Sequence, residues 1–344
     1  MNNQDTEPKR PAMPDPSPIM QLATGYWASA TMLAANDLGI FSVLSEGELT
    51  SAEIADMLGA DIRALTILLD GCCGLGLLVK SVANGLYSLS PLSSAFLVPE
   101  RPGYLGSAIK WSGDQFAAWG RLNETVKTGK PAVAPEDHLG DDPAQTRAFV
   151  LGMYERAQGM ARGVLGFLDL EGCKSLLDVG GGPGAYAMLL AQKYPGLQAV
   201  VRDLPGVTAI AQELIAQHDL SDRVRTEAGD ATDGQYGEEV YDAVLFSGVL
   251  HQMSQTTIRR MFAGALKALK PGGKIIISDM MLDGSKTQPV FSALFSLQML
   301  LTSKEGEVFS STECEKWLCL EGFGDTRVIN LPAPLPYTVV SAIK

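Results

Sequence analysis

A glycine-rich turn directly after a short apolar run constrains the fold of this chain more than any other feature. Residues 176–179 read Leu-Leu-Asp-Val, residues 180–184 read Gly-Gly-Gly-Pro-Gly, and residues 185–193 show a helix-like pattern. Glycine allows backbone N–H groups to approach a ligand closely, and the N-terminus of a helix presents further N–H donors. The segment therefore predicts a buried strand, a ligand-binding turn and a helix, as found in α/β folds.

The spacing of these glycines is compatible with two classes of ligand. Gly180, Gly182 and Ala185 satisfy the G-x-G-x-x-G/A pattern of dinucleotide-binding turns. Asp178, however, precedes glycines at alternate positions and gives D-x-G-x-G-x-G. That form is typical of S-adenosylmethionine (SAM) enzymes, in which the acid lies near the amino-acid moiety of the cofactor. The turn alone leaves both ligands open.

Acidic residues after the next two predicted strands favour SAM. The run 199–201 leads into Arg202-Asp203-Leu204-Pro205, where an acid can accept hydrogen bonds from both hydroxyls of a ribose in either ligand. The run 224–228 leads into Gly229-Asp230-Ala231, where a carboxylate suits an adenine amino group.

Two further strands complete the pattern. Residues 241–246 form the fourth apolar run, and a helix that stops at Lys270-Pro-Gly-Gly273 leads into the fifth, which ends at Ser278-Asp279. This order of elements matches a class I methyltransferase domain. The predicted cofactor-binding residues are Asp178, Gly180, Gly182, Gly184, Asp203, Leu204, Asp230, Ala231 and Ser247.

A histidine and an acid follow the fourth and fifth strands. Ligands of open α/β sheets bind at the carboxyl ends of the strands, so His251 is expected close to the methyl donor. An imidazole there can take a proton from an acceptor hydroxyl. Asp279 is the predicted partner of its other ring nitrogen, which would fix the tautomer and stabilise the imidazolium.

Composition limits the partners of the chain. Its 344 residues predict two domains, and its net charge of −12, with a pI near 4.8, argues against a nucleic-acid partner or an anionic membrane surface. No apolar run approaches the length of a membrane span. The five cysteines show no paired metal spacing, and we expect free thiols in a reducing cytoplasm. Residues 1–18, polar and proline-rich, are expected to form a disordered leader.

The segment 19–100 predicts a winged helix: helical patterns, the last of them over 61–74, followed by a hairpin of 77–82 and 86–89. Its candidate recognition helix carries Arg63 as its only base, beside Asp61 and Asp70, so phosphate contacts are not expected. A dimerisation domain is therefore favoured over a DNA-binding regulator.

Residues 101–170 form a predicted helical bridge that lines the acceptor pocket. Helices are expected over 104–111, 116–127 and 146–168, with a loop over 131–143. The methyltransferase domain itself is expected over 171–344.

These motifs resemble the caffeic acid and acetylserotonin type of O-methyltransferase. The resemblance runs from about residue 19 to residue 344 and rests on the glycine turn, Arg202-Asp203-Leu204-Pro205, Gly229-Asp230, Leu250-His251 and Leu269-Lys-Pro-Gly-Gly273. It implies a Rossmann-like class I methyltransferase domain behind an N-terminal all-α, winged-helix dimerisation domain. It also implies a homodimer that turns SAM into S-adenosylhomocysteine, acts on a small molecule and needs no metal.

The resemblance also implies residue roles. His251 would be the catalytic base and Asp279 its supporting acid. Phe149 and Met153 match a helix that lines the acceptor pocket in the family, and Tyr26, Arg156 and Gln298 are further candidates for contact with the acceptor.

Three departures from the family leave the acceptor atom open. Gln252-Met253 stands where Asp-Trp is common after the histidine, Asp279 is shorter than the usual Glu, and Val308 replaces a second supporting Glu, with Glu307 one residue away. A thioether sulfur needs no base, because its lone pair attacks the methyl group directly. Besides O-methylation, S-methylation of a thioether such as 4-methylthio-2-hydroxybutyrate, a step toward dimethylsulfoniopropionate, is therefore an alternative. A non-catalytic member of the fold is disfavoured by the presence of both His251 and Asp279.

Overall fold

The structure is a computed structural model that describes residues 13–133, 142–333 and 335–344. The chain divides into two compact units, Met1–Gly113 and Asp114–Lys344. Most of the predicted leader, residues 1–12, lies outside the described residues, as does most of the predicted loop 131–143. The first helix begins at Ser17, before the predicted end of the leader.

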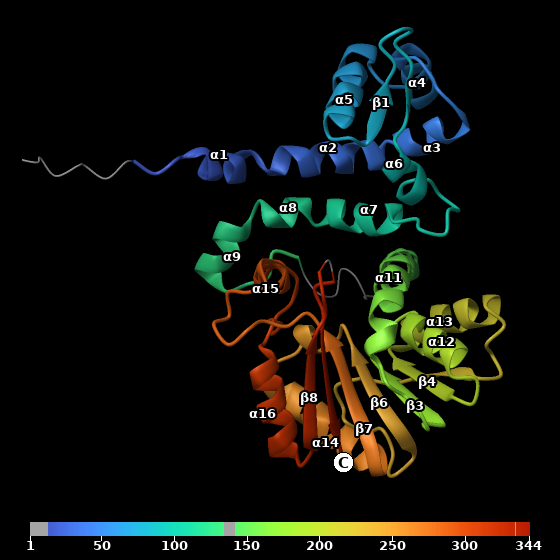
Figure 1. The fold of residues 1–344 in the computed structure, drawn as a ribbon, viewed down its shortest axis with the longest axis vertical. Helices are drawn as coiled ribbons and strands as arrows, with labels where there is room; N and C mark the ends of the chain where they lie inside the picture. The colour runs from blue at the N-terminus through green and yellow to red at the C-terminus, as the bar shows by residue number, and fades with distance from the viewer. Residues whose placement is uncertain (1–12, 134–141, 334) are drawn as a thin grey trace, which may run out of the picture. The chain divides into compact units, whose positions relative to one another are not determined.

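The first unit is mainly helical and carries one hairpin (Figure 1). Its elements are α1 (Ser17–Thr24), α2 (Tyr26–Asp37), α3 (Ile40–Val43), α4 (Ser51–Leu58), α5 (Ile62–Gly74), β1 (Leu78–Lys80), β2 (Tyr87–Leu89), α6 (Pro91–Phe96) and α7 (Gly106–Asp114), whose last residue belongs to the second unit. Thr50 and Glu53 form a reciprocal capping box at the start of α4, which fixes where that helix begins.

The predicted hairpin is present with shorter strands. β1 and β2 pair antiparallel from Leu78–Leu89 to Lys80–Tyr87. Residues 81–86 form the connection, in which Gly85 takes φ +73°, so the Asn84-Gly85 pair lies inside a longer loop and is not a two-residue turn. Tyr87 is 1% exposed and packs in the core of this unit with Phe41, Ile54 and Leu69.

The second unit is built on a seven-stranded sheet in the order β5-β4-β3-β6-β7-β9-β8, in which β9 alone runs antiparallel to its two neighbours. This confirms the predicted α/β, Rossmann-like fold class. The strands are β3 (Ser175–Val179), β4 (Gln198–Asp203), β5 (Val224–Ala228), β6 (Tyr241–Ser247), β7 (Leu269–Asp279), β8 (Gly324–Asn330) and β9 (Thr338–Ile343). The helices are α8 (Phe116–Trp119), α9 (Leu122–Thr128), α11 (Pro143–Val164), α12 (Ala185–Lys193), α13 (Pro205–Gln217), α14 (Gln255–Ala268), α15 (Val290–Thr302) and α16 (Ser311–Glu321).

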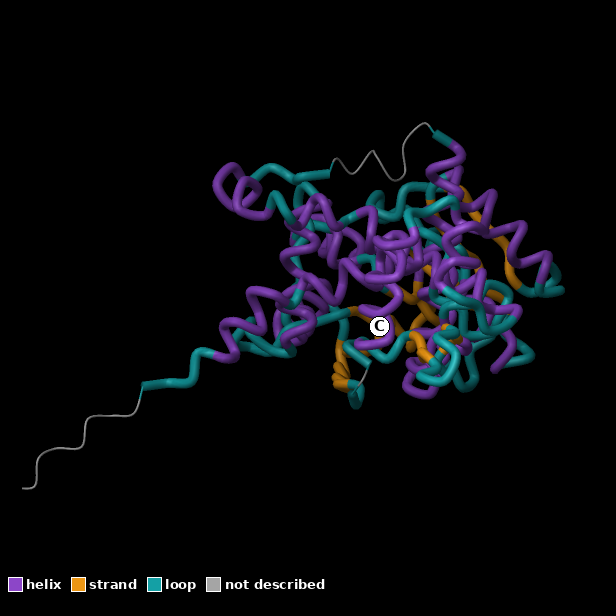
Figure 2. Tube along the Cα trace, turned by 90° about the horizontal axis from the view of Figure 1, so that it is seen from above, coloured by secondary structure: helices purple, strands orange, loops and turns teal. Residues whose placement is uncertain are grey.

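Helices cover both faces of this sheet. Consecutive strand residues point to opposite sides, so neighbours in one strand pack against different helices. Leu176 belongs to an apolar core that includes residues of α11, α12 and α13, whereas Leu177 belongs to a second core with residues of α14 and α16. Figure 2 shows the strands lying among helical segments. The near-continuous apolar runs of the sequence follow from burial on both faces.

Two predicted helices have different bounds in the structure. The single helix expected over 116–127 is wrong: α8 ends at Trp119, and α9 starts after Gly120 and Arg121. The long helix expected over 146–168 begins earlier, at Pro143, because the Asp142 side chain accepts hydrogen bonds from the backbone N–H groups of Ala144 and Gln145. Within the described ranges, no helix is both long and apolar enough to cross a membrane.

Candidate active site

The carboxyl ends of four neighbouring parallel strands bring the predicted site residues to one edge of the sheet. β3 pairs with β4 on one side and with β6 on the other, and β6 pairs with β7. Asp203 and Asp279 end β4 and β7, Ser247 ends β6, and Asp178 is one residue from the end of β3. Ser247 is half-buried and lies opposite Ser278 of β7.

The glycine turn after β3 is held by Asp203. Gly180, Gly182 and Gly184 have φ values of +66°, +55° and +79°, a region that favours glycine. The N–H of Gly182 donates to Asp203 Oδ2 at 2.8 Å, and the N–H of Leu204 donates to Oδ1 of the same carboxylate at 2.7 Å. A Cβ on Gly182 would meet nothing within 4 Å. The Asp203 carboxylate therefore holds the backbone of the turn, and the space beside Gly182 is open.

Asp178 is a buried acid that the backbone N–H of Ala187 stabilises in part, without a hydrogen bond of regular geometry. The residue is fully buried, and neither carboxylate oxygen has a hydrogen-bond partner of regular geometry in the part of the chain that the structure describes. Burial and, next, the negative charge of Asp203 raise the pKa of Asp178 to about 7. An ammonium group would satisfy both oxygens and offset the repulsion. These residues therefore fit the amino-acid end of SAM.

Asp230 lies after β5, on an exposed turn. Its Oδ1 accepts hydrogen bonds from the backbone N–H of Thr232 at 2.7 Å and from the Thr232 hydroxyl at 2.8 Å. The carbonyl of Ala231 accepts a hydrogen bond from the Tyr236 hydroxyl. The predicted adenine side of the cofactor site is thus a short loop with its own internal hydrogen bonds.

His251 and Asp279 form a buried pair. His251 lies in a 3₁₀ turn, Leu250–Gln252, after β6, and its Nδ1 is 2.6 Å from Asp279 Oδ1. The two side chains are 7% and 1% exposed. Oδ1 also accepts a hydrogen bond from the N–H of Met280 at 2.8 Å, which fixes the carboxylate. Because a carboxylate only accepts, Nδ1 carries the hydrogen, and Nε2 is the nitrogen with a free lone pair.

Two phenylalanines of α15 that were not predicted from the sequence form a stacked pair, and one of them lies beside His251. The rings of Phe295 and His251 meet edge-on, with centroids 4.9 Å apart at 81°. Phe291 stacks on Phe295 at 6.2 Å and 8°. Their spacing of four residues on one helix was a usable signal, since such residues share a face.

The predicted acceptor residues fall into three groups. Phe149, Met153 and Arg156 are half-buried on α11, and the Arg156 guanidinium carbon lies 6.0 Å from the centre of the Phe295 ring. Gln298 is 7% exposed, and its amide is engaged by protein: Oε1 accepts from Trp119 Nε1 at 2.6 Å, and Nε2 lies 3.5 Å from Gln115 Oε1. Tyr26 belongs to α2 of the first unit, where it is 58% exposed.

The segment that carries a second acid in the family passes His251 without supplying one. A Cβ on Gly306 would lie 2.8 Å from the carbonyl oxygen of His251, so the two backbones are close. Val308 is 2% exposed, whereas the Glu307 side chain is 67% exposed and lies 3.6 Å from Lys286 Nζ. Asp279 is the acid that the structure places on the imidazole.

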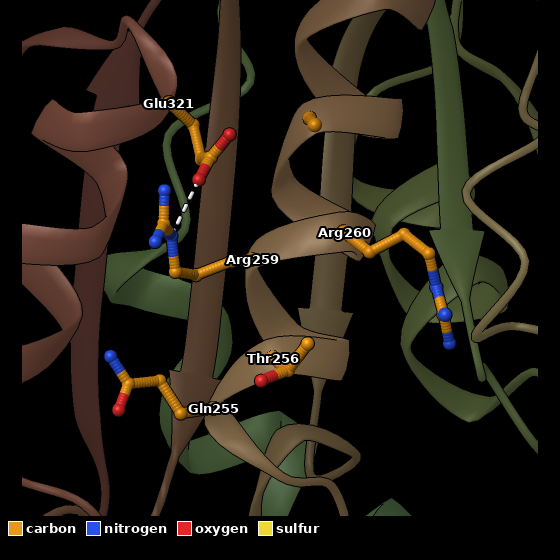
Figure 3. A pocket seen from close by; sticks show the side chains of 6 residues that line it. Gln255, Thr256, Arg259, Arg260 and Glu321 are labelled. Atoms are coloured by element: carbon orange, nitrogen blue, oxygen red, sulfur yellow. Dashed lines mark hydrogen bonds and ion pairs between the residues drawn. The ribbon is translucent and has the colours of Figure 1, made fainter.

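Outside the carboxyl edge of the sheet, neither a metal centre nor a second hollow joins the predicted site residues in the described part of the chain. Among residues 13–133, 142–333 and 335–344, no group of three or more His, Cys, Asp and Glu side chains could hold a metal ion. A hollow over α14 and α16 is lined by Gln255, Thr256, Arg259, Arg260, Ala263 and Glu321 (Figure 3). Arg259 Nε donates to Glu321 there at 2.7 Å, and none of the predicted site residues lines this hollow.

Comparison with known proteins identifies the family of the chain. A family model described as an O-methyltransferase domain matches residues 119–324, and one described as an O-methyltransferase dimerisation domain matches residues 20–99. The 3-hydroxy-5-methyl-1-naphthoate 3-O-methyltransferase of Streptomyces sahachiroi is 33% identical over 97% of this chain and 97% of its own. The tetracenomycin polyketide synthesis 8-O-methyl transferase of Streptomyces glaucescens is 30% identical over 93% of this chain and 94% of its own.

A solved structure shares the fold. Human N-acetylserotonin methyltransferase in complex with SAM matches with a TM-score of 0.86 and 26% identity, over 97% of this chain and 99% of that one. The protein is a SAM-dependent methyltransferase, and the predicted resemblance is confirmed. The chain belongs to the O-methyltransferase family that joins an N-terminal dimerisation domain to a class I methyltransferase domain.

Proposed function

We propose that this enzyme methylates a hydroxyl oxygen of a small aromatic acceptor and that His251 is the general base. The observation that carries the proposal is the 2.6 Å contact between His251 Nδ1 and Asp279 Oδ1, made by two buried side chains. A histidine held in this way at the carboxyl ends of the strands has one nitrogen fixed and one ready to accept a proton.

The chemistry divides simply between cofactor and protein. SAM supplies an electrophilic methyl group on a positively charged sulfur. As the acceptor oxygen bonds to that methyl group, the methyl–sulfur bond would break to leave S-adenosylhomocysteine, and the acceptor proton would move to Nε2 of His251. Asp279 keeps the hydrogen on Nδ1 beforehand and stabilises the imidazolium afterwards. Burial strengthens this interaction, because water does not screen it.

We assign the cofactor contacts to the carboxyl edge of the sheet. Asp178 would receive the ammonium group, Asp203 the ribose hydroxyls, and the loop of Asp230 and Ala231 the adenine. Gly180, Gly182 and Gly184 leave space for close backbone approach, with Leu204 and Ser247 at the rim. The oxygens of Asp178, which make no hydrogen bond of regular geometry among the described residues, support this assignment most directly.

The aromatic side chains of α15, one of them beside His251, and the residues predicted on α11 support an aromatic acceptor. Phe295 and Phe291 form a stacked pair on α15, and Phe149 and Met153 lie on one face of α11. Flat rings and a thioether suit an aromatic ring of the acceptor. The relatives named for a hydroxynaphthoate and a tetracenomycin polyketide point to the same class.

Thioether S-methylation is the second candidate. The observation that favours it is Val308, an apolar residue where the family carries a second acid. A single carboxylate gives less support to the imidazolium than two do. Because sulfur attack needs no base, this loss would matter less for a thioether.

We also propose that the protein is a homodimer formed through its first unit. Five apolar side chains on α1 and α2 are 58–83% exposed: Ile19, Met20, Leu22, Tyr26 and Trp27. A patch of this kind on a domain that matches a dimerisation model suits burial against a second copy. Leu22→Asp with Trp27→Asp should give a monomer by light scattering, whereas an unchanged mass would contradict the assignment.

The test uses labelled SAM with two acceptor pools, one of naphthols and other phenols and one of thioethers. His251→Ala should reduce phenol methylation by about 10²-fold or more. His218→Ala is the matched control. This histidine follows α13 and bonds the Tyr154 hydroxyl, and it is not part of the His251–Asp279 pair. Thioether turnover with little loss in His251→Ala would instead establish S-methylation, and equal losses in both variants would remove His251 as the base.

A further inference from the structure

Arg202 is a buried cation with two acidic partners. It precedes Asp203 at the end of β4 and is 8% exposed. Its Nη1 donates to Glu227 Oε1 at 2.5 Å and its Nη2 donates to Asp233 Oδ2 at 2.8 Å. Burying a guanidinium is costly unless it is paired, so both contacts are needed to hold it there.

The two partners belong to different parts of the fold. Glu227 lies on β5, directly opposite Arg202 in the parallel pairing of β4 and β5. Asp233 lies in the loop between β5 and β6 that also carries Asp230 and Ala231. The Nη1 contact with Glu227 therefore joins two strands, and the Nη2 contact with Asp233 joins the sheet to the loop.

This loop lies directly on the guanidinium. A Cβ on Gly229 would be 2.5 Å from Arg202 Cζ, so any larger residue at 229 would have to displace the guanidinium. The Tyr236 ring lies 5.8 Å from Cζ, and its hydroxyl donates to the carbonyl of Ala231. Asp233 Oδ1 accepts the N–H of Gln235 at 2.7 Å, which fixes the carboxylate that Arg202 binds.

We propose that Arg202 is a positioning residue for adenine: through Asp233 it holds the loop 229–236 so that Asp230 and Ala231 meet the base of the cofactor. The inference rests on the proposed cofactor contacts. The contact of Arg202 with Glu227 stabilises the pairing of β4 and β5 and does not set the affinity for the cofactor. The same arginine thus makes one contact that supports the sheet and one that positions the adenine-binding loop.

Isosteric variants test the two contacts of Arg202 separately. Asp233→Asn removes the charge that Arg202 binds and keeps an oxygen for Gln235, while Glu227→Gln makes the same change on the strand. The probes are S-adenosylhomocysteine and S-inosylhomocysteine, which differ only along one edge of the base: the 6-amino group becomes a 6-oxo group, and N1 changes from acceptor to donor. Calorimetry gives both Kd values, and thermal unfolding gives the stability of each variant.

Asp233→Asn should raise the Kd for S-adenosylhomocysteine by about tenfold and bring the two Kd values close together. Glu227→Gln should lower the unfolding temperature and leave both Kd values within about twofold, the scatter of a distant change. Equal Kd changes in the two variants would mean a merely structural network and would overturn the proposal.

Asp230→Asn separates this inference from the cofactor assignment. If it removes the preference for adenine while Asp233→Asn does not, the adenine site stands and the role of Arg202 fails. If wild type shows no preference between the two probes, the adenine site is wrong and the inference falls with it.

Discussion

The side chain of Val249 lies against the backbone of Gly180, so closely that a Cβ on Gly180 would be 2.6 Å from Val249 Cγ2. Gly180 belongs to the turn after β3, and Val249 is two residues before His251. The proposed cofactor turn therefore packs directly on the segment that carries the proposed base. Glycine is required at 180 both by this contact and by its φ of +66°.

Alanine at two glycines of this turn should have different effects. Gly180→Ala must displace Val249 and should lower both the free energy of unfolding, by about 1–3 kcal/mol, and the affinity for SAM. Gly182→Ala meets no atom within 4 Å and carries only the strain of φ +55°, about 1 kcal/mol, but its methyl group enters the space proposed for the cofactor. Chemical denaturation and calorimetry measure the two quantities. A Gly180→Ala protein as stable as wild type would contradict the packing argument.

The buried carboxyl of Asp178 should make stability fall as pH rises. Burial and the charge of Asp203 raise its pKa from 3.8 to about 7 in the folded protein. Between these values the unfolded chain has released the proton and the folded chain has kept it, so the contribution of Asp178 to the free energy of unfolding decreases across this window and is constant outside it. The decrease is at most about 4 kcal/mol. Urea unfolding across this pH window should show that the free energy of unfolding falls more steeply with pH in wild type than in Asp178→Asn.

The same group should couple cofactor binding to proton release. Below about pH 7 the Asp178 carboxyl of the free enzyme is protonated. An ammonium group binds the ionised form, so binding of S-adenosylhomocysteine near pH 6 should release close to one proton. Calorimetry in two buffers of different ionisation enthalpy counts it. Asp178→Asn should release none, and a wild type that releases none would place the ammonium elsewhere.

Asp242 offers a stability test outside the proposed site. Its carboxylate accepts hydrogen bonds from the backbone N–H groups of Lys174 and Ser175, the Ser175 hydroxyl and Lys270 Nζ, all at 2.8–2.9 Å. Burial alone would raise the pKa of Asp242, but these donors outweigh it and lower the pKa to about 2. The lowered pKa contributes stability above pH 3.8, which is lost as pH falls toward 2. Asp242→Ala should lower the free energy of unfolding by about 2 kcal/mol at neutral pH.

The activity of that variant is the control. Asp242 lies at the start of β6, at the opposite end of the strand from Ser247. Methyl transfer per folded molecule should therefore match wild type. A loss of activity without a loss of stability would show that the amino end of the sheet takes part in the site.

The sequence predicted those parts of the site that depend on local order. A strand, a glycine turn and a helix follow one another directly, so Asp178 and Gly182 could be placed from residue types alone. His251 and Asp279 could be paired because each follows a strand and parallel strands share one carboxyl edge. The strand order of the fold then brings them together.

Contacts between side chains from distant segments could not be predicted in the same way. The engagement of the Gln298 amide by Trp119 joins residues far apart in the sequence, and no periodic pattern encodes it. The approach of Phe295 to His251 likewise depends on how α15 packs. The break between α8 and α9 at Gly120 was missed because the apolar spacing continues across it.

Asp279→Asn should change which nitrogen of His251 carries the hydrogen. An asparagine side chain can place its N–H₂ toward Nδ1, which favours the tautomer with hydrogen on Nε2 and leaves no lone pair there for the acceptor proton. For a phenol, kcat should fall by about 10²–10⁴-fold with little change in the KM for SAM.

Glu307→Gln is the matched control, because its side chain is exposed and pairs with Lys286 away from the imidazole. It should retain wild-type kcat. Equal kcat values for Asp279→Asn and wild type, with phenol as acceptor, would mean that the buried pair orients the turn after β6 without taking part in proton transfer. The burial of both side chains and their 2.6 Å contact argue for proton transfer.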